Sequence, residues 1–360
     1  MFEEGIKALY PGKAGALWDH AWKVGFPDRH TESYRKASLQ PVSKFTLATA
    51  GQVKIEGAIP APIVLLTFEE AKKTYATFLE NRIKSKLKEK NFFAALTNAI
   101  FEQGFFLYIP PNTVIDESIS LSVLYEGENA YFAPHLQIFV GRGSSVRFQV
   151  SPLLKSGVSS QVIDIYMDRN ASCHWVETTD FPYETMYMNA IRATVKENSH
   201  LQVWSHTKGS QFFRQDFQVE LFENSEAVLK GASDLREKRV SHTEVLVAHR
   251  GPHARSNQHF KGVMQDSSRS TFEGKIFVEP EAQKTEAYQL NNNLLLGAES
   301  MVFSKPNLEI FADDVKASHG ATVAQFSQEE LFYFQTRGIG KEKAAQFLAA
   351  GFLKDVIYNV

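Results

Sequence analysis

Cysteine is almost absent from the 360-residue chain, which contains only Cys173. The chain can therefore form no internal disulfide, and its own thiolates are too few to hold an iron–sulfur cluster or a structural zinc ion. A lone thiol is typical of a reducing compartment, so we expect a cytoplasmic protein. Because Cys173 follows a turn at the start of a new strand, we expect it to line the core.

An excess of either charge is also lacking. The chain has 39 Lys and Arg against 41 Asp and Glu, a formal net charge of −2, whereas nucleic-acid binders usually carry a basic excess. No apolar run approaches the roughly 18–20 residues that a membrane helix needs. The first residues include Glu3 and Glu4 and contain no apolar segment typical of a secretory signal. We expect neither nucleic acid nor a membrane among the partners.

Catalytic motifs are missing as well. The segment Gly141-Arg-Gly143 lacks the Lys and the Ser or Thr of a phosphate-binding loop, and no Gly-x-Ser-x-Gly nucleophile elbow occurs. Asp313 and Asp314 are adjacent on an extended segment and point apart, which is a poor geometry for an acid–base pair. None of these three patterns therefore predicts a catalytic site.

What is present divides the chain into three regions. Residues 1–103 read as mainly helical, with a capping box from Thr67 to Glu70 that predicts a helix over 68–88 and a second helix over 92–103. Residues 104–326 contain strands rich in β-branched and aromatic residues. Residues 327–360 read as helical again, with a break at Gly338-Ile-Gly340.

A repeated turn organises the middle region. Gly or Asn recurs at Gly143, Asn170, Asn198, Asn224 and Gly251, with spacings of 27, 28, 26 and 27 residues. These residues tolerate a left-handed backbone, which a chain that turns the same corner repeatedly requires. A period this short has no room for helices or for the four strands of a propeller blade. The pattern predicts a β-solenoid with one repeat per coil.

The C-terminal helices allow two interpretations. The helix expected over 341–356 has an apolar side, and the open edge of a solenoid needs a cap. An amphipathic helix pair at the end of a chain also suits docking on a partner. The residues alone leave both interpretations open.

Several segments near the C-terminus resemble the SufB/SufD family of the SUF iron–sulfur cluster assembly system, and its SufD members in particular. The segments that carry this resemblance are Phe272-Glu-Gly-Lys-Ile-Phe-Val278, Ala282-Gln-Lys-Thr-Glu-Ala-Tyr-Gln289, Asn293-Leu-Leu-Leu296, Ala312-Asp-Asp-Val315, Ser318-His-Gly-Ala-Thr322 and Glu330-Leu-Phe-Tyr-Phe-Gln-Thr-Arg-Gly-Ile339.

The resemblance implies a mainly β fold, a right-handed parallel β-helix flanked by helical N- and C-terminal regions. It further implies a non-enzymatic subunit that assembles with a SufB-like paralogue and a SufC-like ABC ATPase, to which any ATPase activity would belong. The SufC-docking part maps onto residues 327–360, where Ile339, Phe347 and Phe352 are the apolar side chains expected to anchor the partner.

The family motif also places a cluster-site histidine on His319. Many SufD sequences have a Cys two residues earlier, where this chain has Ala317, so a thiolate cannot come from that position. We expect no cofactor bound by this chain alone, and His319 as a metal ligand shared with SufB, toward either a transient iron–sulfur cluster or iron at the SufB interface.

Three alternatives accompany this interpretation. The chain could be a purely structural SufB/SufC adaptor in which His319 contacts no metal. It could be a β-helix polysaccharide lyase, although the Asp-rich cleft of such enzymes is not evident. In isolation, an open sheet edge could pair with a second copy of the chain and give a homodimer.

Overall fold

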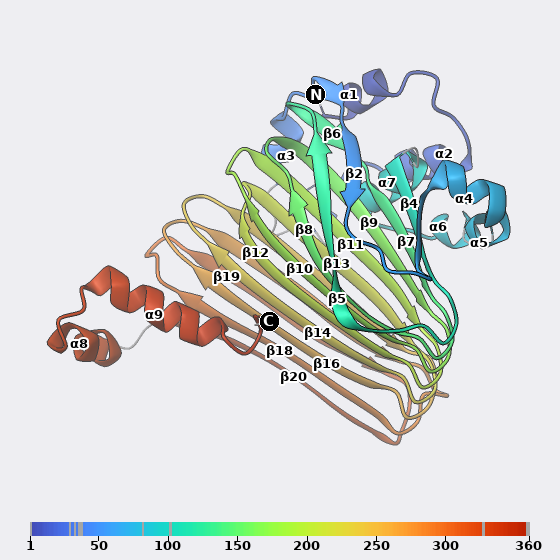
Figure 1. The fold of residues 1–360 in the computed structure, drawn as a ribbon. Helices are drawn as coiled ribbons and strands as arrows, with labels where there is room; N and C mark the ends of the chain where they lie inside the picture. Colours follow the sequence, from blue (N-terminus) through green and yellow to red (C-terminus); the bar gives the residue numbers. More distant parts are fainter. Residues whose placement is uncertain are drawn as a thin grey trace.

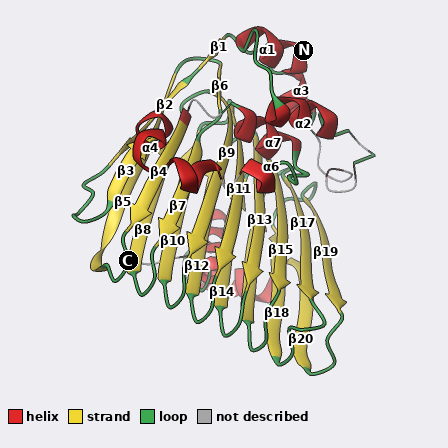
Figure 2. Cartoon of the chain, turned by 90° about the vertical axis from the view of Figure 1, so that its right-hand side faces the viewer, coloured by secondary structure: helices red, strands yellow, loops and turns green. Residues whose placement is uncertain are grey.

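The structure is a computed structural model that describes residues 2–28, 30–31, 34, 39–80, 83–100, 103–325 and 328–357. From residue 104 onward the chain winds into a parallel β-solenoid of about eight turns, with helices at both ends (Figure 1). Each coil contributes one long strand to each of two sheets, called sheet A and sheet B below (Figure 2). No helix in these ranges is long and apolar enough to cross a bilayer.

Within the described ranges, sheet A has eleven strands and sheet B has nine. The strands of sheet A are β1 (Thr49–Ala50), β3 (Val64–Thr67), β4 (Gly104–Ile109), β6 (Ala130–Phe132), β7 (His135–Val140), β9 (Gly157–Met167), β11 (Thr185–Val195), β13 (Phe212–Leu221), β15 (Val240–His249), β17 (Arg269–Val278) and β19 (Met301–Ile310). Those of sheet B are β2 (Gln52–Glu56), β5 (Val114–Glu126), β8 (Ser145–Leu153), β10 (Ser172–Phe181), β12 (His200–Gly209), β14 (Glu226–Leu235), β16 (Arg255–Met264), β18 (Thr285–Leu295) and β20 (Val315–Gln325).

Helices of the N-terminal region cover part of the outer face of sheet A. They are α1 (Phe2–Leu9), α2 (Ala16–Val24), α3 (Gln40–Lys44), α4 (Phe68–Thr74), α5 (Ala76–Glu80), α6 (Ile83–Lys86) and α7 (Phe92–Ala99). Phe92 and Phe93 of α7 are fully buried and join one apolar cluster with side chains of β6, β9, β11 and β13. Burial of these aromatic rings fixes the helical layer to the sheet.

The N-terminal region differs from the mainly helical expectation because it also supplies three strands. β2 pairs antiparallel with β5, and β3 pairs antiparallel with β4, so each sheet begins with a short antiparallel strand. The capping box at Thr67 and Glu70 is confirmed, but the helix expected over 68–88 is three short helices, α4 to α6. The chain leaves the helix at Tyr75, whose φ of −117° is not helical. Residues 81–82 and 101–102, within the two expected helices, lie outside the described residues.

The predicted corners are confirmed at four of five positions. Gly143, Asn170, Asn198 and Asn224 have φ between 54° and 68°, and each amide donates to a carbonyl at the corner of the next coil, at 3.0–3.1 Å. The prediction of Gly251 is wrong. The left-handed residue of that corner is His253, with φ 59°, which makes the equivalent bond to Gln283 (2.9 Å).

Gly251 serves a different purpose at the same corner. A Cβ on this residue would lie 2.4 Å from the backbone nitrogen of Glu223 in the neighbouring coil, so glycine is required for close approach rather than for a left-handed backbone. The corner series also extends to Asn112 and Lys284, with φ of 59° and 58°. The repeat therefore lengthens toward both ends of the solenoid.

The lumen between the sheets has an apolar and a polar half. Cys173 lies in the apolar core, as expected, and burial raises the pKa of its thiol to about 12. In the polar half, Glu177 of sheet B accepts hydrogen bonds from two residues of sheet A, Tyr187 Oη (3.1 Å) and Asn189 Nδ2 (3.0 Å). Burial raises the pKa of Glu177 to about 7. Further polar side chains continue along this half: Gln161, Gln215 and Thr243 from sheet A, and Thr179, Ser205, Thr207 and Ser233 from sheet B.

The corner geometry makes a prediction about stability. Replacing Asn198 by Ala should lower the free energy of unfolding by about 1 kcal/mol, because a left-handed backbone strains a residue with a Cβ and asparagine tolerates it best. Replacing Asn198 by Gly should change it by less than about 0.5 kcal/mol. Urea unfolding followed by circular dichroism measures both. An Ala variant as stable as the wild type would contradict the strain at this corner.

The buried Glu177 makes a second prediction. The pKa of this carboxyl rises from 4.5 to about 7 on folding, so the folded state keeps a proton that the unfolded state has lost. Its contribution is therefore complete below about pH 4.5 and declines as the pH rises to about 7, by about 3 kcal/mol in total. Glu177→Gln should remove this decline from the pH profile of unfolding. The exposed Glu223→Gln is the control and should keep the wild-type profile.

Candidate functional site

The last coil leaves the solenoid open at one end. β19 and β20 are the final strands of sheets A and B, and within the described ranges no strand pairs with their outer edges. Large apolar side chains are exposed in or beside this coil: Met301, Phe303, Phe311 and Val323. An unpaired sheet edge flanked by apolar side chains is a ready template for another chain.

His319 lies in the middle of β20, at the rim of this open end. Ala317 packs inward beside Ala287 and Ile276, and alternation along a strand puts His319 on the same inward face. The residue next to His319 in the previous coil is Gln289, which is buried. Because no further coil covers it, His319 is exposed. Its imidazole therefore stands at the mouth of the lumen.

The acidic residues near this histidine in the sequence do not join it. Glu309 is on the outer face of sheet A, where it pairs with Lys275 at 2.6 Å, and Asp313 and Asp314 lie in the corner between β19 and β20. The described residues contain no group of three or more His, Cys, Asp or Glu side chains that could hold a metal ion.

The lone cysteine cannot complete a site at the mouth. Cys173 is on β10 and His319 on β20, five strands apart in sheet B, or roughly 24 Å at the usual spacing between strands. At the mouth this chain therefore offers a single imidazole as a soft-metal ligand. Any further ligands would have to come from another chain.

A helical arm extends beyond the solenoid. It consists of α8 (Gln328–Thr336) and α9 (Lys341–Leu353), separated at Gly338, whose φ is 77°. The end of α9 packs on the outer face of sheet B, where Ala349, Leu353 and Val356 meet Ala232, Val263 and Leu294. Residue 326 of the predicted solenoid region and residues 327 and 358–360 of the predicted C-terminal region lie outside the described residues.

Two lysines of sheet B hold the end of the arm. Lys261 Nζ donates to the carbonyl of Phe352 (2.8 Å) and to Asp355 Oδ1 (2.6 Å), and Lys230 Nζ donates to the carbonyl of Asp355 (3.0 Å). Cations at a helix C-terminus are favourable because the carbonyl groups there carry partial negative charge. The arm is thus attached at one end only.

The rest of the arm presents aromatic side chains to solvent. Phe332, Tyr333 and Phe347 are 66 %, 58 % and 49 % exposed, and Ile339 is half-buried. Phe352 differs from the other predicted anchors, because it packs against sheet B under Lys261. Phe332 and Tyr333 were missed in the sequence, although the run Leu331-Phe-Tyr-Phe334 was a usable signal.

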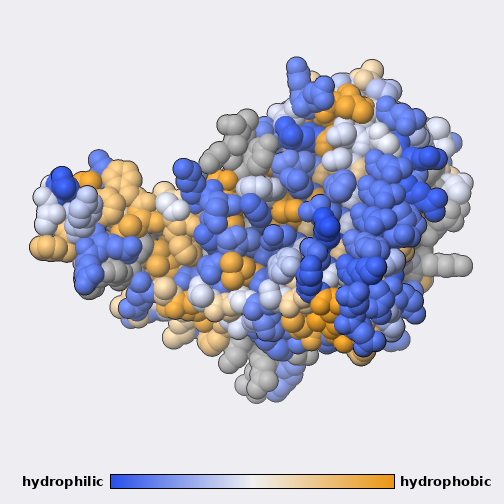
Figure 3. Space-filling model, turned by 90° about the horizontal axis from the view of Figure 1, so that it is seen from below, coloured by the Kyte–Doolittle hydropathy of each residue, from blue (hydrophilic) through white to orange (hydrophobic). Residues whose placement is uncertain are grey.

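The arm does not cap the solenoid. α9 packs against β16, and β20 stays exposed along most of its length. Apolar patches interrupt the hydrophilic surface both on this side of the molecule and on the arm (Figure 3). The interpretation of the C-terminal helices as a cap over the last coil is therefore wrong.

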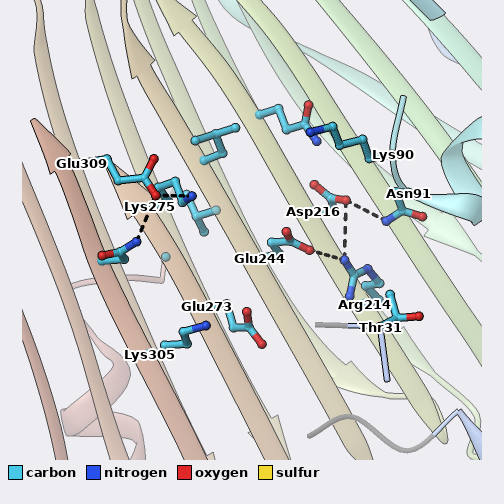
Figure 4. A pocket seen from close by; sticks show the side chains of 15 residues that line it. Thr31, Lys90, Asn91, Arg214, Asp216, Glu244, Glu273, Lys275, Lys305 and Glu309 are labelled. Carbon is cyan, nitrogen blue, oxygen red and sulfur yellow. Dashed lines mark hydrogen bonds and ion pairs between the residues drawn. The ribbon is translucent and has the colours of Figure 1, made fainter. Parts of the chain in front are cut away.

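A second polar site lies on the outer face of sheet A, beside the N-terminal layer. It is a hollow of about 620 Å³. Figure 4 shows Arg214 between Asp216 and Glu244, and Asn91 reaching Asp216 from the N-terminal layer. Asn91 Nδ2 donates to Asp216 Oδ2 (2.7 Å), and Arg214 pairs with Glu244. Arg192 Nη1 donates to Asp216 Oδ1 at 2.9 Å.

The charges of this second site are arranged in compensating pairs. Burial alone would raise the pKa of Asp216, but the positive charges of Arg192 and Arg214 hold this pKa below its usual value. Burial, together with the charge of Asp216, raises the pKa of Glu244 to about 7. Glu89, which precedes α7, binds Arg192 at 2.8 Å. The network connects the N-terminal layer to sheet A, and its members are too far apart in the sequence for the pattern to be predicted.

The fold and the sites define a class of protein. A β-solenoid that begins with antiparallel strands and ends in an exposed last coil, with one imidazole at the mouth and an aromatic arm attached at one end, has the surfaces of an assembly subunit. Comparison with protein families gives a match over residues 123–352 to the model described as SUF system FeS cluster assembly, SufBD core domain. The chain belongs to this SufB/SufD family, whose members are components of iron–sulfur cluster assembly.

Individual relatives agree with the family. An iron–sulfur cluster assembly SufBD family protein of Synechocystis sp. is 26 % identical over 78 % of this chain and 65 % of its own length. The iron–sulfur cluster assembly protein SufD of Escherichia coli is 37 % identical over 37 % of this chain and 32 % of its own length. The chloroplastic protein ABCI7 of Arabidopsis thaliana is 42 % identical over 32 % and 24 %. The matches cover less than two thirds of the length of each of these three relatives. Membership of this family argues against the alternative interpretation of the chain as a polysaccharide lyase.

Proposed function

We propose that this chain is the SufD-like subunit of an assembly with a SufB-like paralogue and a SufC-like ABC ATPase. In this proposal the chain supports iron–sulfur cluster assembly at the SufB interface and performs no catalysis itself. The observation that carries the proposal is the open last coil with His319 at its rim. The cluster, or the iron that enters it, is cargo at this interface rather than a resident cofactor.

Two properties of the open end support the proposal of a SufB-like paralogue as partner. The edges of β19 and β20 offer unpaired backbone groups over ten or more residues, which a second β-solenoid can continue by strand pairing. The mouth also contributes one imidazole and no thiolate, so a partner that brings thiolates would complete the ligand set. A second copy of this chain could pair with the edges but would bring no thiolate to the mouth.

The helical arm supports the proposal that an ATPase binds this chain. Its exposed aromatic side chains belong to α8 and α9, and these two helices extend away from the solenoid (Figure 1). Aromatic anchors surrounded by polar residues are typical of the energetic centre of an interface. Among the predicted anchors, the exposure of Phe347 and the half-buried position of Ile339 support this role, whereas Phe352 packs against sheet B.

A structural adaptor without metal contact is the second candidate, because the described residues contain no group of three or more His, Cys, Asp or Glu side chains that could hold a metal ion. Replacing His319 separates the two candidates. In a reconstituted complex with SufB and SufC, His319→Ala should reduce cluster formation at least about tenfold, since the loss of a ligand lowers metal affinity. Circular dichroism and co-purification with both partners should stay unchanged. Cluster formation is followed by visible absorbance.

Two variants accompany this experiment. His319→Cys should recover part of the activity, because a thiolate is also an iron ligand. Cys173→Ser should have little effect on cluster formation, because Cys173 is buried in the lumen away from the mouth. Normal cluster formation by His319→Ala would establish the adaptor and reject the ligand role.

The arm is tested separately. Phe347→Ala and Phe332→Ala should each weaken SufC binding by about 2 kcal/mol, or roughly thirtyfold in Kd, if these rings are the anchors. Removal of residues 327–360 should abolish binding. Calorimetric titration of the full chain with SufC measures the affinities.

Glu342→Ala provides the matched control, because it is an exposed change on α9 that removes no aromatic ring. Phe352→Ala should loosen the attachment of α9 and lower stability more than it changes the contact surface. Undiminished SufC binding by the Phe332→Ala, Phe347→Ala double variant would show that the ATPase docks elsewhere.

A further inference from the structure

Two buried glutamines form an amide ladder beneath His319. Gln258 on β16, Gln289 on β18 and His319 on β20 occupy the same position in three successive coils. Gln289 Nε2 donates to Gln258 Oε1 at 2.6 Å. Both glutamines are 2 % exposed or less. The ladder therefore runs up the lumen and reaches the mouth at the histidine.

The upper end of this ladder is incomplete. Gln289 Oε1 is buried and accepts no hydrogen bond within the described part of the chain. An acceptor that is buried without a donor costs free energy, so such atoms in proteins are nearly always paired. Since Nε2 of Gln289 is used toward Gln258, its Oε1 is the atom left for the next coil. The next coil supplies His319 at this position.

A glycine in the opposite sheet holds the amide in place. A Cβ on Gly274 of β17 would lie 2.4 Å from both Nε2 and Oε1 of Gln289. The amide therefore crosses the lumen and rests on the backbone of sheet A, where any larger residue would displace it. Pro306 lies beside Gly274 in the last coil. The orientation of Gln289 is thus fixed by the coil below and by the facing sheet.

We propose that Gln289 is a positioning residue for His319: its Oε1, which is unpaired in the structure, is the acceptor to which the exposed imidazole turns one N–H, and this leaves the other nitrogen, without a proton, toward the mouth. A neutral imidazole carries one N–H, and the nitrogen without it is the one that binds a metal. A hydrogen bond to the N–H selects the tautomer and orients the ring. The role of the free nitrogen rests on the proposed function, whereas the hydrogen bond does not.

This arrangement explains why three separated segments act together. Gly274, Gln289 and His319 belong to three of the segments that carry the family resemblance. The sequence places them 15 and 30 residues apart. The coils bring them together at one end of the lumen. There Gly274 leaves room for the amide, Gln289 supplies the acceptor and His319 supplies the donor.

The test is the tautomer of His319 in the isolated full-length chain, measured without iron or partners. Nuclear magnetic resonance of ¹⁵N-histidine-labelled protein reports the ring nitrogens, and the signals of His319 are those missing from His319→Ala. We expect one dominant tautomer at neutral pH in the wild type. Gln289→Leu should give a mixture of both tautomers. Gln289→Glu should restore a single tautomer, because a carboxylate also accepts the N–H.

Gln202→Leu is the matched control, since it makes the same change on the exposed outer face of sheet B and should leave the wild-type spectrum. A mixture of tautomers in the wild-type chain, or an unchanged His319 spectrum in Gln289→Leu, would overturn the proposal. The wild-type measurement keeps the proposal falsifiable even where a variant does not fold. Because no cluster is involved, failure here leaves the ligand role of His319 to the reconstituted complex.

Discussion

The structure depends on the backbone hydrogen-bond ladder that joins each coil to the next. Every strand from β7 to β20 pairs in parallel with a strand of the neighbouring coil, so each residue lies beside its counterpart one turn away. This pairing requires the chain to turn the same corner in every coil. The left-handed residues at Gly143, Asn170, Asn198 and Asn224 meet that requirement, and His253 meets it where the corner is longer. Side chains at equivalent positions of successive coils therefore stack in columns along the solenoid.

A ladder of this kind has two ends, and the protein treats them differently. At the first coil, β2 and β3 pair antiparallel with β5 and β4, and their apolar side chains complete the core. At the last coil the edges of β19 and β20 are unpaired within the described ranges, and α9 leaves over the outer face of sheet B instead of covering them. The unpaired edges of the last coil, flanked by exposed apolar side chains, suit pairing with another chain.

Charge and aromatic packing attach the remaining parts to the solenoid. The N-terminal layer is held by Phe92 and Phe93 and by the paired charges around Asp216. Buried charges carry a desolvation cost, so the network of Glu89, Arg192 and Asp216 contributes a specific attachment more than a strong one. The arm uses the same combination at a smaller scale, with apolar contacts from Leu353 and a lysine pair at the end of α9.

Sequence patterns could predict the parts of the molecule that depend on local backbone preference. The sequence predicted the corners with Asn and Gly, the capping box at Thr67 and the helix break at Gly338. The resemblance located His319 at the end of the solenoid. The sequence could not separate His253 from Gly251 as the corner residue, because both fit a turn and only the approach of Glu223 distinguishes them. It also missed β2 and β3, whose partners β5 and β4 lie far along the chain.

The sequence by itself thus determined the repeat, the solenoid and the family. Only the tertiary structure decided that Phe352 packs within the chain, that Glu309 faces away from His319, and that Gln289 lies beneath His319 on Gly274. The physical reason is that neighbours in adjacent coils are about 30 residues apart in sequence. Their register depends on how the corners absorb the varying length of the repeat, whereas one additional residue within a strand would turn each following side chain of that strand to the other face.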